Sequence, residues 1–142
     1  MNEYTLNQIE IGMECSFTRT ITEEMENDFR RISGDDNPLH HDDEFAISVS
    51  DGKYTSHVSF GMLTASLYST FAGMYLPGKY SLIHSLDDLS FMNPVYAGDE
   101  LTVTGKVIEK NTDLRLIVLK VMIKKDKGIN VSKARMKVLV LK

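Results

Sequence analysis

Two side chains that can exchange protons near neutral pH, Asp35 and His40, lie five residues apart in this chain. Gly34 permits a sharp turn of the backbone before Asp35, and Pro38 restricts the chain just ahead of His40. Histidine titrates near neutrality, and a partly desolvated aspartate is pushed toward the same range. A carboxylate and an imidazole held on one rigid loop are suited to moving protons on one face of a substrate.

The same stretch also has the composition of an ordinary turn. Asn37 can hydrogen-bond the neighbouring backbone and hold the shape of the loop. Asp35 can cap backbone amides in the same way, without any part in a reaction. Residue types and spacing alone therefore leave two interpretations open, a proton-transfer pair and a structural turn.

We expect a helix just before this loop. Thr22 is a suitable N-cap, and acidic residues follow it in the first turn, where the helix dipole favours negative charge. Met25, Phe29 and Ile32 fall at positions i, i+4 and i+7, which predicts one apolar face. Gly34 ends the helix, because glycine readily adopts the left-handed cap conformation.

Two more helices are expected after the loop. Asp42 to Ile47 predicts a short helix, and Gly61 to Tyr75 predicts a long one. Apolar residues cover most sides of the long helix, so we expect it to be buried nearly all round. Pro77-Gly78 stops it.

The second half of the chain alternates between apolar and polar residues as antiparallel strands do. Cys15 lies in an expected first strand, and hairpin turns are expected at Asn111-Thr112-Asp113 and Asp126-Lys127-Gly128. Later strands are expected at Tyr80 to Met92, interrupted at Asp87-Asp88, and at Glu100 to Glu109, Leu114 to Lys124 and Ile129 to Leu141. A long buried helix with an antiparallel meander predicts one α+β domain over residues 1–142.

The loop and its flanks resemble the signature of the MaoC-like, (R)-specific enoyl-coenzyme A hydratase family. That signature has an aromatic, an aliphatic and a small residue, then G-D-x-N-P-aliphatic-H and, after five residues, another small one. The stretch FRRISGDDNPLHHDDEFA meets it without a gap at Phe29, Ile32, Ser33, Gly34, Asp35, Asn37, Pro38, Leu39, His40 and Ala46.

The likeness continues beyond the loop. Family members usually open the central helix with His-Gly-Met-Leu, and this chain has Phe60-Gly61-Met62-Leu63. Pro77-Gly78 and the pattern from Phe91 through Pro94-Val95 to Gly98-Asp99 are also similar to the family. Phe60 departs from the usual histidine, which we expect to alter the pocket wall.

The resemblance implies a hot-dog fold, in which an antiparallel sheet wraps around a long central helix. It implies that Asp35 and His40 bind one water, with His40 as base and Asp35 as proton donor to the α-carbon or the reverse. The Gly61 N–H would bind the thioester oxygen, and Asn37 would hold the loop. Ser66 would support the pair, although a serine in a buried helix often bonds only to the preceding turn's carbonyl.

The implied substrates are 2-enoyl or 3-hydroxyacyl thioesters of coenzyme A or of an acyl carrier protein, with no other cofactor and no metal. Leu39, Phe60 and Met62 are expected to contact the acyl group. Acyl length is expected to depend on the segment Phe45 to Phe60 and on Met62. The resemblance also implies a homodimer, because hot-dog units usually pair along the sheet.

Composition restricts the other classes of function. A net charge of −4 over 142 residues argues against nucleic-acid binding, which needs a clustered basic surface. Cys15 is the sole cysteine, so no intrachain disulfide can form. The apolar-rich stretch Gly61 to Leu76 is too short to cross a membrane, and Met1 to Tyr4 shows no signal-peptide features. We therefore expect a cytoplasmic protein without a membrane partner.

Two alternative functions and one alternative site differ in the residues they need. A hot-dog thioesterase needs a carboxylate on or near the central helix, and Gly61 to Tyr75 contains none. A catalytically silent acyl-thioester binding module would have a degraded Asp–His pair, whereas this pair is intact. A metal site built from the run His40 to Asp43 is disfavoured, because adjacent residues rarely point at one ion.

Overall fold

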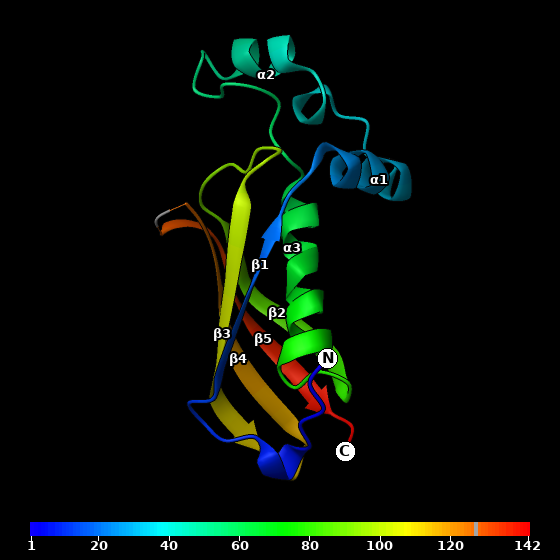
Figure 1. Cartoon of the computed structure of the whole chain (residues 1–142), viewed down its shortest axis with the longest axis vertical. Helices are drawn as coiled ribbons and strands as arrows, with labels where there is room; N and C mark the ends of the chain where they lie inside the picture. The colour runs from blue at the N-terminus through cyan, green and yellow to red at the C-terminus, as the bar shows by residue number, and fades with distance from the viewer. Residues whose placement is uncertain (127) are drawn as a thin grey trace.

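The computed structural model describes residues 1–126 and 128–142, and within them five strands form one antiparallel sheet (Figure 1). The strand order is β1-β3-β4-β5-β2, so β1 and β2 are the edges. The strands are β1 (Glu14–Thr20), β2 (Ser81–Phe91), β3 (Glu100–Asn111), β4 (Leu116–Lys125) and β5 (Ile129–Val140). The predicted α+β architecture is confirmed.

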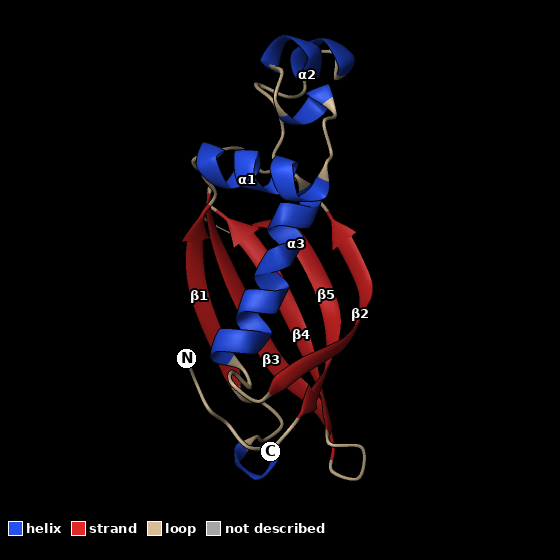
Figure 2. Cartoon of the chain, turned by 90° about the vertical axis from the view of Figure 1, so that its right-hand side faces the viewer, coloured by secondary structure: helices blue, strands red, loops and turns tan. Residues whose placement is uncertain are grey.

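The central helix, α3 (Gly61–Thr70), lies across the inner face of this sheet, as Figure 2 shows. It continues as a π-helical turn, η3 (Phe71–Tyr75), where Phe71 is fully buried. A Cβ added at Gly105 of β3 would lie 2.4 Å from Phe71 Cζ, so the glycine lets the ring approach the strand closely. Tyr68 is also fully buried, and its hydroxyl lies 2.7 Å from Ser132 Oγ of β5.

The expectation that this helix is buried nearly all round is wrong for one face. Met62 is 58% exposed, Met74 is 44% exposed, and Ser66 and Ser69 are exposed between them. These residues share one side of the helix, because they recur at near-helical spacing. A single sheet covers one side of a helix. The opposite side carries two methionines and small serines, which are not polar enough for the sequence pattern to reveal an open face.

Helix α1 (Glu23–Ser33) sits at one end of the sheet, next to the start of α3 (Figure 2). Its predicted ends are confirmed: the Thr22 side chain accepts a hydrogen bond from Met25 N, and Gly34 is left-handed at φ 73°. Its predicted apolar face is partly wrong, because Ile32 is 83% exposed. A buried glutamate, Glu26, takes a place on the inward face instead.

Beyond α1, helix α2 (Asp43–Val49) stands away from the sheet, and two segments join it to the rest of the chain (Figures 1 and 2). Asp42 caps it by accepting a hydrogen bond from Phe45 N. Ala46 is buried, whereas apolar side chains on its other faces are exposed. Sheet contacts therefore do not set the position of α2. A short 3-10 turn, η2 (Pro38–His40), precedes it, and another, η1 (Leu6–Gln8), precedes β1.

The strands differ from expectation mainly at their ends. β2 is continuous, and the predicted interruption at Asp87-Asp88 is an irregularity in its pairing with β5, where Asp88 has a φ of 53°. Leu114 lies in a turn and is 64% exposed, so the third expected strand begins later than predicted. Of the predicted turn Asp126-Lys127-Gly128, Lys127 lies outside the described residues.

Among the residues that the structure describes, no helix combines the length and apolar character needed to span a lipid bilayer.

Candidate active site

The loop that joins α1 to α2, residues 34–42, is held in shape by its own side chains. Asp35 Oδ1 accepts a hydrogen bond from Asn37 N over 3.1 Å, and Asn37 Oδ1 accepts one from Leu39 N over 3.0 Å. Pro38 opens η2, where its missing N–H costs nothing. We call these residues the Asp35–His40 loop. Asp35 caps a backbone amide here, as the turn interpretation predicted, but with one carboxylate oxygen only.

The other oxygen of Asp35 faces His40. Asp35 Oδ2 lies 4.0 Å from His40 Nε2, which is too long for a direct hydrogen bond. That separation lets one water contact both atoms. The Asp35 side chain is 47% exposed and that of His40 is 16% exposed, so water reaches the pair from the carboxylate side.

The ring of His40 is oriented by the backbone of another segment. Nδ1 lies 2.7 Å from the carbonyl oxygen of Val58, which can only accept a hydrogen bond. Nδ1 therefore carries the proton, and Nε2 of the neutral ring is left with a free lone pair toward Asp35. In this tautomer Nε2 is the ring atom that can accept a proton.

An aromatic stack supports the same ring. The centroid of Phe60 lies 4.1 Å from that of His40, and Phe29 packs against Phe60 at 5.1 Å. Phe60 is only 2% exposed. We predicted that Phe60 contacts the acyl group; the structure shows its ring packed against the imidazole of His40, where it supports the ring, and does not include Phe60 in the cavity lining described below.

A cavity of about 320 Å³ opens beside the pair. His40 and Gly61 line it, together with residues from the end of β2, the loop that follows it and the start of β5, among them Phe91, Val95 and Val131. The cavity therefore has both polar and apolar walls, and it is lined by the His40 imidazole and by the first residue of α3. Such a wall suits a short apolar chain joined to a polar reacting group.

Gly61 supplies a hydrogen-bond donor to this cavity. It is the first residue of α3, where backbone N–H groups have no partner within the helix and the helix dipole is positive. A Cβ at this position would lie 3.5 Å from the ring of Phe91, which also lines the cavity. Backbone N–H groups at the start of a helix are of the kind that can stabilise an oxygen gaining negative charge.

Other predicted residues lie elsewhere. Met62 points to solvent and does not line the cavity, because the first turn of α3 directs it to the open face. Leu39 is partly buried in η2 and does not line it either. The Ser66 hydroxyl donates to the Leu63 carbonyl oxygen over 2.6 Å, so this chain alone shows the local alternative rather than support of the pair.

The side chain of His57, outside the Asp35–His40 loop, contacts a carboxylate at each ring nitrogen. His57 lies between Glu26 of α1 and Asp43 of α2, at 3.2 and 2.6 Å. Hydrophobic periodicity could not find this group, because the three residues are far apart in sequence. One signal was present: Glu26 adjoins Met25 on the inward face of α1, where a carboxylate needs a partner.

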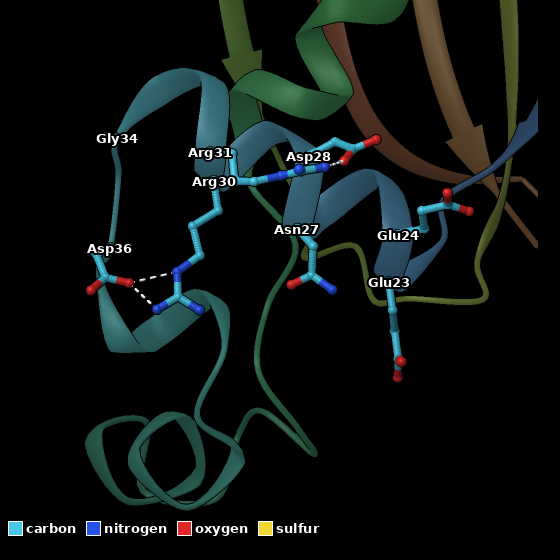
Figure 3. Close-up of a pocket in the computed structure, with 8 residues that line it drawn as sticks. All are labelled: Glu23, Glu24, Asn27, Asp28, Arg30, Arg31, Gly34 and Asp36. Atoms are coloured by element: carbon cyan, nitrogen blue, oxygen red, sulfur yellow. Dashed lines mark hydrogen bonds and ion pairs between the residues drawn. The ribbon is translucent and has the colours of Figure 1, made fainter.

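A wider depression of about 690 Å³ lies over the solvent side of α1 and does not include His40 (Figure 3). Its two arginines are already paired, Arg30 with Asp36 and Arg31 with Asp28. Glu23 and Glu24 add further negative charge. Because no cation of this depression is unpaired within the described residues, it is a poor site for the phosphates of a thioester carrier.

The described part of the chain contains no group of three or more His, Cys, Asp or Glu side chains arranged to hold a metal ion.

Known proteins are similar to this chain in both sequence and fold. Residues 6–128 match the family described as MaoC like domain. An (R)-specific enoyl-CoA hydratase of Aeromonas caviae is 35% identical over 111 residues, 78% of this chain and 80% of that protein. A mitochondrial 3-hydroxyacyl-[acyl-carrier-protein] dehydratase of Solanum lycopersicum is 33% identical over 95 residues, 67% of this chain and 54% of that protein. The solved (R)-hydratase from Aeromonas caviae superposes with a TM-score of 0.85 at 30% identity, covering 93% of this chain and 97% of that one.

Proposed function

Because this chain belongs to the MaoC-like domain family, we propose that it is an (R)-specific hydratase that adds water to 2-enoyl thioesters and catalyses the reverse dehydration. The carrier of the acyl group is coenzyme A or an acyl carrier protein, since relatives of both kinds match the chain. Water and the thioester supply every atom of the product, so the proposed reaction needs no further cofactor.

The proposed reaction begins with a water held between His40 Nε2 and Asp35 Oδ2, 4.0 Å apart. Nε2 accepts a proton as the water oxygen bonds to C3 of the enoyl group. The electron pair of the C2–C3 double bond moves toward the thioester carbonyl, and the Gly61 N–H stabilises the oxygen that gains charge. The proton taken from water is then delivered to C2 by the Asp35–His40 pair, which restores the site.

One observation carries this proposal: His40 Nε2 has a free lone pair, and His40 lines the same cavity as the Gly61 amide. A base and an oxyanion donor on one small cavity are what addition to an activated double bond requires.

The sequence of the central helix argues against the thioesterase alternative. Gly61 to Tyr75 contains no acidic residue. Hydrolysis would need such a group to direct water at the thioester carbonyl. The silent binding module is disfavoured because the Asp35–His40 pair has both its members and a water-accessible geometry.

We also propose that two copies of the chain form a homodimer. Strands β1 and β2 are sheet edges with unpaired backbone groups, which proteins usually cover. Met62 of α3 and Met74 of η3 add exposed apolar surface on the side of the sheet that carries the helix. Light scattering on the purified protein tests this: a dimer mass is expected, and a monomer at micromolar concentration would contradict it.

Crotonyl-coenzyme A tests the proposed activity. We expect loss of the enoyl absorbance and formation of 3-hydroxybutyryl-coenzyme A with the (R) configuration, measured by chiral chromatography after hydrolysis. His40→Gln serves as the control and should remove most of the turnover. Release of free thiol without hydration would indicate a thioesterase instead, and an (S) product would contradict the proposed site.

A further inference from the structure

Three consecutive residues just before α3, His57 to Ser59, join parts of the chain that are distant in sequence. Ser59 N donates to the Val95 carbonyl oxygen over 2.8 Å, which ties the segment to the cavity wall. Val58 N donates to the Leu39 carbonyl oxygen over 3.0 Å, and the Val58 carbonyl oxygen accepts the proton of His40 Nδ1. The segment therefore links the Asp35–His40 loop to the cavity, and it orients the proposed base.

The side chain of His57 contacts a carboxylate on each helix that flanks the loop. Its Nε2 lies 3.2 Å from Glu26 Oε2 on α1, and its Nδ1 lies 2.6 Å from Asp43 Oδ1 on α2. The His57 backbone N–H also donates to Asp43 Oδ1, over 2.9 Å. Ionised carboxylates only accept hydrogen bonds, so with both carboxylates ionised both ring nitrogens donate, which is the imidazolium form.

The electrostatic environment favours this charged arrangement. Partial burial lowers the pKa of His57, but the hydrogen bonds and negative charges of Asp43 and Glu26 outweigh burial and raise it above its ordinary value. The pKa of Asp43 is lowered, first by the backbone N–H of His57 and then by the His57 ring. The cation and the anion therefore support one another.

Glu26 is an unexpected residue at its position. It is 4% exposed, on the inward face of α1 beside the partly buried Met25 and Phe29. Within the described residues its Oε1 is buried and has no hydrogen-bond partner. A buried carboxylate costs free energy unless a cation pairs with it, and apolar replacements of buried ion pairs are often equally stable. Packing alone therefore does not account for Glu26.

We propose that His57 is a positioning residue: through Glu26 in the first turn of α1 and Asp43 at the start of α2, it clamps together the two helices that flank the Asp35–His40 loop and so holds Asp35 and His40 in their reactive geometry. The loop begins where α1 ends, at Ser33, and it finishes where α2 begins, at Asp43. Because α2 stands away from the sheet (Figure 2), the clamp supplies a contact that the sheet cannot. The activity readout of this inference rests on the proposed hydratase function.

Two variants separate positioning from stability. His57→Phe keeps a ring but removes both donors, and it leaves Glu26 as an uncompensated buried charge, so Tm should fall. Adding Glu26→Leu replaces the pair by an apolar contact and should restore Tm. If the clamp positions the pair, kcat for crotonyl-coenzyme A stays about 10- to 100-fold low in both variants while KM changes little. His84→Phe, at an exposed histidine of β2, is the matched control and should retain wild-type kcat.

The result that overturns the inference is a double variant, Glu26→Leu with His57→Phe, in which kcat returns together with Tm. In that case His57 would only neutralise a buried charge. A second readout does not depend on activity: in nitrogen-15 spectra, the His40 Nδ1–H signal should shift or broaden in the double variant and stay unchanged in His84→Phe. An unchanged His40 signal would also overturn the inference. If the wild type does not hydrate the substrate, only the proposed function is rejected. The His40 signal would then decide whether His57 positions the loop.

Discussion

The imidazole of His40 donates from Nδ1 to the backbone carbonyl oxygen of Val58 over 2.7 Å. Val58 in turn donates its N–H to the carbonyl oxygen of Leu39, the residue before His40. This reciprocal pair of hydrogen bonds holds both the backbone and the ring of the proposed base. It also determines the tautomer, and with it the nitrogen that faces Asp35.

The tautomer of His40 can be measured directly. At a pH where the ring is neutral, nitrogen-15 NMR of histidine-labelled protein should show a protonated Nδ1 and an unprotonated Nε2 for this residue, because a carbonyl cannot donate. Assignment by His40→Gln identifies the signal. A protonated Nε2 in the resting protein would contradict the role of that atom as base.

The clamp at His57 predicts a pH window for stability. Since the pKa of His57 is raised on folding, its contribution is complete below the unfolded value of about 6.5 and is lost as pH rises through the folded pKa. Since the pKa of Asp43 is lowered, its contribution is complete above about pH 3.9 and is lost as pH falls through the folded pKa. The difference in Tm between wild type and His57→Phe should therefore be largest between these limits.

Thermal melting across a pH series checks this window. The facing charged groups are Glu26 from α1 and Asp43 from α2, so the same pH dependence should be weaker in Glu26→Leu. A Tm difference that is constant from pH 4 to pH 9 would show that His57 contributes no charge to the folded state.

The contact between Gly105 and Phe71 predicts a local limit on substitution. Gly105→Ala would place a Cβ 2.4 Å from the Phe71 ring, which is fully buried and cannot move aside. We expect destabilisation of about 1–3 kcal/mol by overpacking, measured by urea unfolding. Gly73→Ala is the matched control, since its Cβ would meet nothing within 4 Å, and it should be neutral or slightly stabilising. Equal stability of the two variants would contradict this packing.

Acyl length should depend on the cavity wall and not on Met62. Val131 lines the cavity and is 1% exposed, so Val131→Phe should reduce its volume and shift the preference of the enzyme toward shorter 2-enoyl-coenzyme A substrates. Met62→Phe, at a residue that is 58% exposed, should leave the length profile unchanged. Initial rates over a series of chain lengths measure both. A profile that changes for Met62→Phe alone would place the acyl group along the open face of α3.

Local chemistry was predictable from the sequence where a few neighbouring residues determine it. Thr22 and Gly34 bound α1 as expected, because capping depends on the residue itself and its nearest backbone. The geometry of the Asp35–His40 loop could be anticipated for the same reason. The strand pattern indicated the sheet, since alternation reports directly on which side of a strand is buried.

Features that depend on distant partners were not predictable. Ile32 fits the apolar period of α1, but it is exposed, whereas Met25 and Phe29 pack against the core. The open face of α3 has mostly small residues, which are not polar enough for the sequence pattern to indicate that this face is exposed. His57 could not be distinguished from a solvated histidine, because its partners come from two separate helices. Such contacts require the tertiary arrangement of the chain.

The central claim is that Asp35 and His40 act as one proton-transfer unit, and a double-mutant cycle tests it most directly. Rates of crotonyl-coenzyme A hydration are compared for wild type, Asp35→Asn, His40→Gln and the double variant, with melting curves to confirm folding. Each single variant should lose about 10²–10⁴-fold in kcat, and the double variant should be little worse than either, because members of one unit are non-additive. A folded single variant with near-normal kcat, or losses that multiply in the double variant, would contradict the claim.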